Sequence, residues 1–383
     1  MLDCKKGLFS LPDDVTYLNN AYMSPILNST EQIGINALSK KLNPTNIGVD
    51  DFFHPVNKLR ETFGKLIHAP AEQIALIPSV SYGISTVTKN LKSKVNGEII
   101  LIEEQFPSNF YPWEIYAQEH DQTLKIIKVD KSKEGWASYW NESILEAIND
   151  NTTVVSMAHV HWTDGTLFKL KEIREITKKH DAALVIDGTQ SVGALPLFID
   201  DIQVDALIVG GYKWLLGHYG LGLAYFAPSF NNGTPIDDNW INKKDSENFQ
   251  KLVDYAVEYK EGAARYSMGE QSSFVLLPML QDGLNHILEW GVENIQNYCR
   301  NLHNLLCNKL KDSPYQVSQP GASSSHLIGI RFDQTVDIPT VKRKLTEEKI
   351  FVSYRGDAMR ISIHLYNDEV DIERFAKILV DCS

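Results

Sequence analysis

Short, uninterrupted apolar runs constrain the fold of this 383-residue chain more than any other feature. Six runs are predicted as strands, and most do not alternate between apolar and polar residues, which is typical of parallel strands covered on both faces. Amphipathic segments such as 141–150 and 168–181 separate them and are predicted as helices. This alternation predicts a parallel sheet with helices packed on it. The predicted strands are 97–104, 125–130, 152–160, 182–187, 205–211 and 221–226.

The pattern changes after the last of these strands. Residues 231–260 are polar and rich in turn residues, which indicates an excursion at the surface. A long helical stretch follows, with an expected interruption at Pro278, and shorter strands and helices then alternate to the C-terminus. A chain of this length usually forms two domains. We expect an N-terminal arm (1–16) that joins the small domain, a large domain (17–284) and a small α+β domain (285–383).

Composition excludes several classes of protein. The formal net charge of -12 argues against a nucleic-acid surface, because phosphate binding needs clustered Lys and Arg. The four cysteines form no C-x-x-C pair and are too few for a disulfide framework, which favours a reducing compartment. No secretion signal is visible, and no apolar run approaches the ~18 residues of a membrane span. We expect a cytoplasmic protein that binds neither nucleic acid nor membrane.

One lysine lies where a charged amine is costly. Lys213 comes just after the apolar strand 205–211, between Tyr212 and Trp214. Ligands of parallel sheets collect at the carboxyl ends of the strands, so this lysine is expected near a site. Burial disfavours the charged form of a lysine and thereby makes the amine a better nucleophile. A lone lysine at a strand end usually extends to solvent, so its neighbours decide between the two interpretations.

Other strand-end groups complete a chemically specific set. The strand 182–187 ends at Asp187, and Gln190 follows in the same turn. Segment 71–91 is predicted as a short strand, a Ser/Gly turn and a helix that begins near Ser81, and helix N-termini bind anions. Pyridoxal 5'-phosphate needs an amine to hold it as an imine, a seat for its phosphate and an acid beside its ring nitrogen. Each feature alone has an ordinary structural explanation, but their combination predicts this cofactor.

Segment 185–226 resembles the cofactor segment of the class V aminotransferase family, which includes cysteine desulfurases, selenocysteine lyases, kynureninases and isopenicillin N epimerase-like proteins. The motif D-x-x-Q at 187–190, with a lysine 23 positions after the glutamine, carries the likeness. The resemblance implies the PLP-dependent transferase fold type I, an α/β fold whose central sheet is mainly parallel and seven-stranded, with helices on both faces and a smaller α+β C-terminal domain. Further matches span nearly the whole chain, at 17–25, 103–113, 159–170, 264–280 and 359–367.

The resemblance also implies a role for each matching position. Lys213 would hold the cofactor and then move the α-proton, and Asp187 would face the pyridine nitrogen. Arg360 would bind the α-carboxylate of the substrate, with Arg355 as the alternative, and Asn20 would contribute to the substrate pocket. The other cofactor contacts would be Ser81 and the Tyr82 amide at the phosphate, helped by Tyr212, with Phe106 on the ring and Gln190 at the ring hydroxyl.

Departures from the family pattern reduce the number of reactions that are expected of this chain. Persulfide-forming desulfurases carry a cysteine before the carboxylate-binding arginine, but the stretch "IFVSYRGDAMR" has none, so a persulfide mechanism is not expected. The residues at positions 106 and 212, Phe106 and Tyr212, match those of kynureninases, whereas Gln190 does not. Trp162 stands where many members have asparagine, and Glu270 stands where a threonine usually reaches the phosphate of the neighbouring subunit.

The reaction itself stays open at this point. We expect transamination of a small amino acid, with a lyase that cleaves a C–S or Cβ–Cγ bond, or an epimerase, as alternatives. Family analogy predicts a homodimer in which the Gly269 region lies near the cofactor of the partner. His159 and His161 lie two apart on one strand, but no carboxylate or cysteine at useful spacing completes a ligand set, so no metal is expected.

Overall fold

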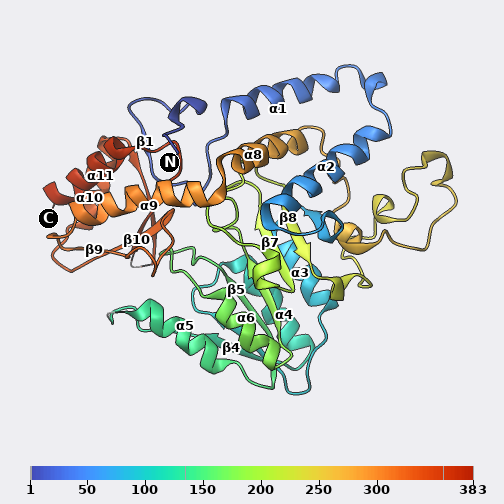
Figure 1. Cartoon of the computed structure of the whole chain (residues 1–383), viewed down its shortest axis with the longest axis horizontal. Coiled ribbons are helices and arrows are strands. Elements are labelled where there is room, and N and C mark those ends of the chain that lie inside the picture. The colour runs from blue at the N-terminus through green and yellow to red at the C-terminus, as the bar shows by residue number, and fades with distance from the viewer. Residues whose placement is uncertain (1, 134, 357, 383) are drawn as a thin grey trace.

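A seven-stranded sheet forms the centre of the molecule (Figure 1). The computed structural model describes residues 2–133, 135–356 and 358–382. The strand order is β2-β8-β7-β6-β5-β3-β4; β8 is antiparallel to both neighbours and the other adjacent pairs are parallel. This confirms the mainly parallel sheet, and each of the six predicted strands lies in it. The strands are β2 (Ile74–Ile77), β3 (Glu98–Ile102), β4 (Thr123–Ile127), β5 (Thr152–Ala158), β6 (Ala183–Asp187), β7 (Ala206–Gly210) and β8 (Gly222–Phe226).

Hydrophobic cores cover both faces of this sheet. Along β6, Leu184 and Ile186 belong to the larger core, whereas Val185 between them belongs to the smaller one. Successive side chains of a strand point to opposite faces, so the two cores lie on opposite sides. This double burial explains the continuous apolar runs of the sequence. The helices between these strands are α3 (Val80–Asn90), α4 (Tyr111–Glu119), α5 (Trp136–Ala147), α6 (Leu170–Lys179) and α7 (Ile199–Ile202).

A second, four-stranded antiparallel sheet has the order β12-β13-β10-β9. Its strands are β9 (Tyr315–Val317), β10 (Leu327–Phe332), β12 (Ser353–Arg355) and β13 (Ala358–Ser362), accompanied by α10 (Ile338–Glu347) and α11 (Glu369–Asp381). Near the N-terminus, β1 (Thr16–Tyr17) pairs in parallel with β11 (Ile350–Phe351). The two ends of the chain therefore meet at the same end of the molecule (Figure 1).

The long helices contain the main differences from the sequence prediction. Pro278 does not interrupt the helical stretch, because it lies in the first turn of α8, where a backbone N–H has no partner within the helix. The break falls at Gly291, whose φ of 76° ends α8. The expected boundary at 285 lies inside α8. Two helices were not predicted, α1 (Asn28–Lys40) and α2 (Asp50–Ile67), and they pack on α8 (Leu276–Trp290), which α9 (Val292–Lys309) follows.

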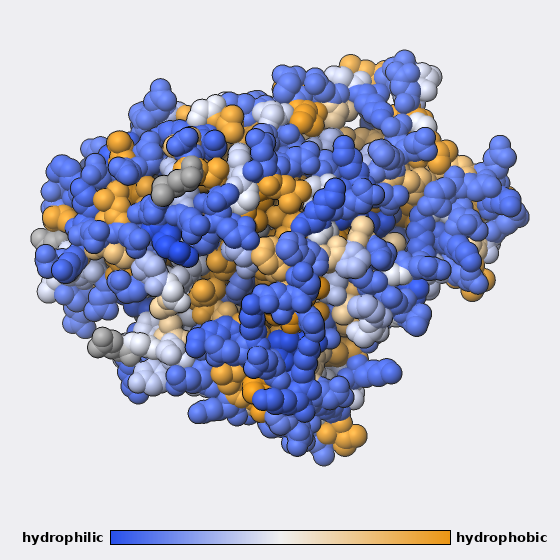
Figure 2. All heavy atoms as spheres, in the orientation of Figure 1, coloured by the Kyte–Doolittle hydropathy of each residue, from blue (hydrophilic) through white to orange (hydrophobic). Residues whose placement is uncertain are grey.

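The segment 231–260 forms short 3-10 turns and loops at the surface, as its composition predicts. Several of its apolar side chains are exposed, such as Tyr255 at 92%, whereas Ile241 is buried. The face shown in Figure 2 is mainly hydrophilic, with hydrophobic residues showing through near its middle. Within the described residues, no helix combines the length and apolar composition that crossing a membrane requires.

Candidate active site

Lys213 lies at the carboxyl end of the central sheet, three residues after the end of β7. Only 7% of its surface is exposed. The turn that carries it is closed by a hydrogen bond from the amide of Gly217 to the carbonyl of Gly211, at 2.9 Å. Asp187 ends β6, which is the next strand of the sheet, and both side chains line one enclosed pocket. The predicted strand-end constellation is therefore assembled in the structure.

The environment of Lys213 favours an uncharged amine. Burial and the charges of Arg360 and Arg355 lower the pKa of Lys213, the charge of Asp187 opposes them, and the net pKa is about 7. No hydrogen bond or ion pair joins its Nζ to another residue in the described part of the chain. The rings of Phe106 and Tyr212 lie close, with centroids 5.6 and 5.4 Å from Nζ. An amine of this kind can form a covalent bond to a carbonyl group near neutral pH.

Asp187 supplies a buried carboxyl group in the same pocket. Its Oδ1 accepts a hydrogen bond from the amide of Thr189 at 2.9 Å. Burial raises the pKa of Asp187, and hydrogen bonds from Thr189 and the charge of Lys213 oppose this rise. A cationic group bound beside this carboxyl would lower its pKa, because opposite charges stabilise each other's ionised forms.

Gln190 is held in place by its neighbours. Its Oε1 accepts a hydrogen bond from the indole of Trp214 at 2.9 Å, and its Nε2 donates to the carbonyl of Ala21 at 3.1 Å. The second N–H of the amide makes no bond to the described chain, and the side chain lines the pocket. This also explains the tryptophan after Lys213: Trp214 is fully buried and orients Gln190.

The N-terminus of α3 opens at the same pocket through Val80. Ser79 is the N-cap, and its Oγ accepts from the amide of Tyr82 at 3.2 Å and lies 3.0 Å from the Oγ of Ser81. The Tyr82 amide that was expected at a phosphate is thus used by the cap here. Val80 and Ser81 are left with amides that no described residue accepts, and the Tyr82 hydroxyl is buried without a partner.

Arg360 is a buried cation without a carboxylate partner in the described chain. It is 1% exposed, and burial lowers the pKa of its guanidinium to about 9. Its Nη1 donates to the carbonyl of Trp162 at 2.8 Å, while Nη2 lies 3.5 Å from Oδ1 of Asn19 and 3.4 Å from Oγ of Ser353. Its Nε has no hydrogen-bond partner. Such a group is suited to bind an anion.

The structure brings Asn19, not Asn20, to the guanidinium of Arg360. The Oδ1 of Asn20 accepts from the hydroxyl of Tyr366 at 3.1 Å, and its Nδ2 is buried without a partner. Sequence reasoning missed Asn19 and Ser353. Asn19 lies beside the expected residue in "YLNNAYMSP", whereas Ser353 has no signal in the sequence, because its role depends on the register between β12 and β13.

These residues fit pyridoxal phosphate. Lys213 is an amine that can lose its proton, Asp187 offers a carboxyl for a ring nitrogen, and Phe106 provides an aromatic surface beside the amine. The free amides at the start of α3 and the unpartnered Tyr82 hydroxyl could hold a phosphate. When bound, the cofactor withdraws electrons from the α-carbon of an amino acid.

His159 and His161 belong to the interior of the protein. His161 is fully buried; its Nδ1 lies 2.8 Å from Oγ1 of Thr163 and its Nε2 lies 3.2 Å from the carbonyl of Glu103. Burial lowers the pKa of His159 to about 3. Among the described residues, no group of three His, Cys, Asp or Glu side chains is arranged to hold a metal.

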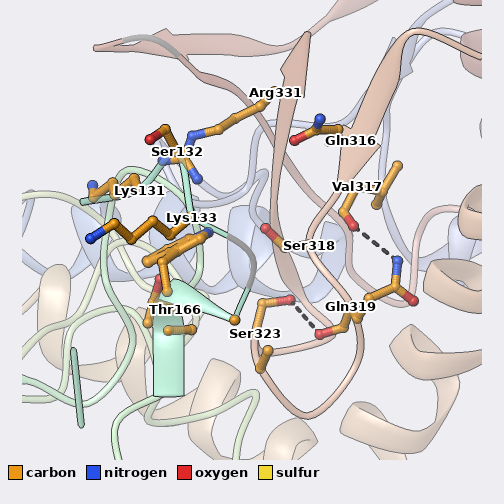
Figure 3. A pocket seen from close by; sticks show the side chains of 14 residues that line it. Lys131, Ser132, Lys133, Thr166, Gln316, Val317, Ser318, Gln319, Ser323 and Arg331 are labelled. Carbon is orange, nitrogen blue, oxygen red and sulfur yellow. Dashed lines mark hydrogen bonds between the residues drawn. The ribbon is translucent and has the colours of Figure 1, made fainter. Parts of the chain in front are cut away.

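A larger cavity of about 610 Å³ lies between the start of α5 and the strands β9 and β10 (Figure 3). Two of its cations contact a buried acid: Lys131 Nζ lies 3.1 Å and Arg331 Nη2 3.5 Å from Oδ2 of Asp164. Lys131 also pairs with Glu104 at 2.6 Å. This cluster joins the two sheets. Among the described residues that line it, the cavity has no buried amine comparable to Lys213, so the pocket at Lys213 is the stronger candidate site.

Comparison with known proteins identifies the same family as the sequence motifs. The profile of the family described as "Aminotransferase class-V" matches residues 48–375. An uncharacterised aminotransferase, YcbU, of Bacillus subtilis is 24% identical over 316 residues, which cover 82% of this chain and 80% of that protein. Isopenicillin N epimerase of Streptomyces clavuligerus is 24% identical over 329 residues, covering 84% and 82%.

Two solved structures share the fold. A lysine-to-alanine mutant of the protein C-DES, with glycine covalently linked to its PLP cofactor, superposes with a TM-score of 0.86 at 17% identity, covering 99% of this chain and 100% of that one. Cysteine desulfurase from Thermococcus onnurineus NA1, in its apo form, gives a TM-score of 0.82 at 18% identity, covering 100% and 98%. The likeness confirms the fold type I architecture.

Proposed function

Because this chain belongs to the aminotransferase class-V family, we propose that it acts on a small amino acid through Lys213 and that the reaction is transamination. The protein is a PLP-dependent enzyme. One observation carries the proposal: a nearly buried lysine whose pKa falls to about 7 lies in one pocket with Asp187, and it is within electrostatic reach of Arg360, a buried cation that pairs with no carboxylate of the described chain. Amine, acid and carboxylate-binding cation are the three groups that this chemistry requires.

Each residue has a defined task in this proposal. Arg360 binds the α-carboxylate of the substrate and is itself held by the Trp162 carbonyl, which fixes where the α-carbon lies. Lys213 would take the proton from that carbon as a general base, since its pKa lies near neutral pH. It would then deliver the proton to the imine carbon of the cofactor. Asp187 would hold a carboxylate beside the ring nitrogen of the bound cofactor. The aromatic rings of Phe106 and Tyr212 exclude water from the amine.

A lyase is the second candidate. The relatives include proteins named as cysteine desulfurases, and the same base could remove the α-proton in either reaction. A persulfide on this chain is not supported, because none of the four cysteines lines the pocket: Cys299 is buried in the core, and burial raises its pKa. A lyase would therefore release its sulfur or carbon fragment without a protein thiol.

One experiment separates the two reactions. The purified enzyme with its cofactor is mixed with a panel of amino acids, and absorbance and products are followed together. Transamination predicts conversion to the pyridoxamine form with release of an oxo acid, reversed by adding an oxo acid. Pyruvate or alanine that accumulates well beyond one equivalent per cofactor, without an added oxo acid, would establish the lyase instead.

The Lys213→Ala variant tests the assignment of the amine. It is expected to lose the absorbance of the covalently bound cofactor, whereas the same change at the exposed Lys92 should leave it intact. An unchanged imine absorbance in Lys213→Ala would mean that another amine carries the cofactor, and the proposal would fail.

The homodimer and the cytoplasmic location remain predictions. In the single chain, Gly269 donates its amide to Oδ2 of Asp237 at 2.6 Å, and Glu270 adopts a φ of 54°. We propose that this turn faces the cofactor of a second copy. Light scattering tests the assembly, and a monomer at micromolar concentration would remove that role for Gly269.

A further inference from the structure

A second arginine lies on the same face of the small sheet as Arg360. In the antiparallel pair β12 and β13, Ser353 is opposite Arg360, and their side chains approach to 3.4 Å. Arg355 is two residues after Ser353, and side chains two apart on a strand share a face. The backbone register therefore directs Arg355 toward the side of the sheet that carries Arg360.

Both arginines meet at Trp162. Arg360 donates to the backbone carbonyl of this residue, and the guanidinium carbon of Arg355 lies 5.6 Å from the centre of its indole ring. The indole of Trp162 lines the pocket that contains Lys213, and it packs edge-on against Phe106 with ring centroids 5.4 Å apart. Trp162 thus contacts both cations and also lines the pocket of Lys213.

Neither guanidinium is neutralised by the described chain. Arg355 donates from Nη1 to the carbonyl of Tyr354 at 2.8 Å, and no described carboxylate forms an ion pair with it. Among the described residues, Glu104 is an acid near this turn, and its Oε2 pairs with Lys131 at 2.6 Å. Arg355 and Arg360 also repel each other. Burial is the main cause of the lowered pKa of Arg360, and the charge of Arg355 is the second cause.

One α-carboxylate compensates one of these cations. We propose that the substrate is an amino acid with a second anionic group on its side chain, and that Arg355 binds this group while Arg360 binds the α-carboxylate. The inference rests on the proposed function and narrows it to acidic amino acids. It makes Arg355 a specificity residue and assigns to Trp162 the task of keeping the two anion sites apart.

Matched pairs of substrates test the proposal on the cofactor-loaded enzyme. L-Aspartate is compared with L-asparagine, and L-glutamate with L-glutamine, by kcat/KM. The wild type is expected to prefer the acid of at least one pair by about 10- to 100-fold, as a charge-assisted hydrogen bond would give. Arg355→Gln should bring that ratio near one and Arg355→Lys should retain part of it. Arg343→Gln, the same change at an exposed arginine on α10, should preserve it.

A binding measurement covers longer substrates and does not depend on turnover. Titration calorimetry with succinate, glutarate and adipate, each against its monoamide, should show one dicarboxylate that binds at least about tenfold more tightly than its monoamide, and Arg355→Gln should remove this difference. Circular dichroism checks that each variant is folded.

The outcomes separate this inference from the proposed function. If the enzyme reacts with amino acids but treats acids and amides alike, or if Arg355→Gln weakens both members of a pair equally, the second anion site is wrong and the proposed function stands. If no amino acid changes the cofactor spectrum, both fail.

Discussion

Replacing the buried lysine should make the cofactor-free protein more stable. The ordinary pKa of a lysine is 10.5, and Lys213 has a value of about 7 in the folded chain. Below pH 7 this difference costs the folded state about 5 kcal/mol, because the unfolded chain keeps a solvated ammonium group that the pocket disfavours. Lys213→Met has a similar length and removes the charge, so it should recover most of this cost.

The sign of the pH dependence follows from proton binding. Between pH 7 and 10.5 the unfolded chain holds more protons at this position than the folded chain, so the wild type gains stability as the pH rises. The gain is about 1.4 kcal/mol per pH unit. The methionine variant lacks this gain. Its advantage should therefore fall from about 4 kcal/mol at pH 7.5 to about 1 kcal/mol at pH 9.5.

Urea unfolding of the cofactor-free proteins, followed by tryptophan fluorescence at several pH values, measures the difference. Groups other than Lys213 titrate in both proteins and largely cancel. Lys92→Met, at an exposed position, controls for the general effect of exchanging lysine for methionine. A difference between Lys213→Met and wild type that is the same at about pH 7.5 and about pH 9.5 would refute the depressed pKa, and with it the argument that the pocket prepares the amine.

Two further changes separate stability from chemistry. Asp187→Asn keeps an acceptor for the Thr189 amide and removes a buried charge, so urea unfolding should show no loss of stability, while kcat falls by about 100-fold or more because an amide cannot balance a cationic ring nitrogen. Gly193→Ala should lower stability by about 2 kcal/mol or more in the same assay, since φ is 99° and the new Cβ would lie 2.3 Å from the carbonyl oxygen of Trp214; normal stability would contradict this close approach.

The sheet and its strand-end residues could be predicted because both depend on local patterns. Continuous apolar runs indicate strands buried on both faces, and the carboxyl ends of parallel strands meet at one edge, so Asp187 and Lys213 had to lie near each other once β6 and β7 were neighbours. Their proximity needs no knowledge of loops. The same reasoning could not find α1 and α2, which lie before the first strand of the pattern and pack mainly on α8.

The surroundings of Arg360 depend on contacts between distant segments, and these could not be predicted. Ser353 reaches Arg360 only because β12 pairs with β13 in one register, and a shift of one residue would turn it to the other face. Asn19 and Asn20 are adjacent, so their side chains point in different directions, and the choice between them depends on how residues 17–20 lie against β13. No periodicity of either segment contains this information.

The site keeps three buried ionisable side chains, and the ligands explain how the fold tolerates them. Lys213, Arg360 and Asp187 are each buried with a pKa displaced against the charged form, which costs folding energy when the site holds no ligand. Pyridoxal phosphate and an amino acid bring the complementary groups: a carbonyl for the amine, a carboxylate for the guanidinium and a ring nitrogen for the acid. Ligand binding therefore stabilises the folded state and offsets the free-energy cost of burying these groups. Without such ligands, burying three ionisable side chains beside the apolar strands β6 and β7 would only lower the stability of the fold.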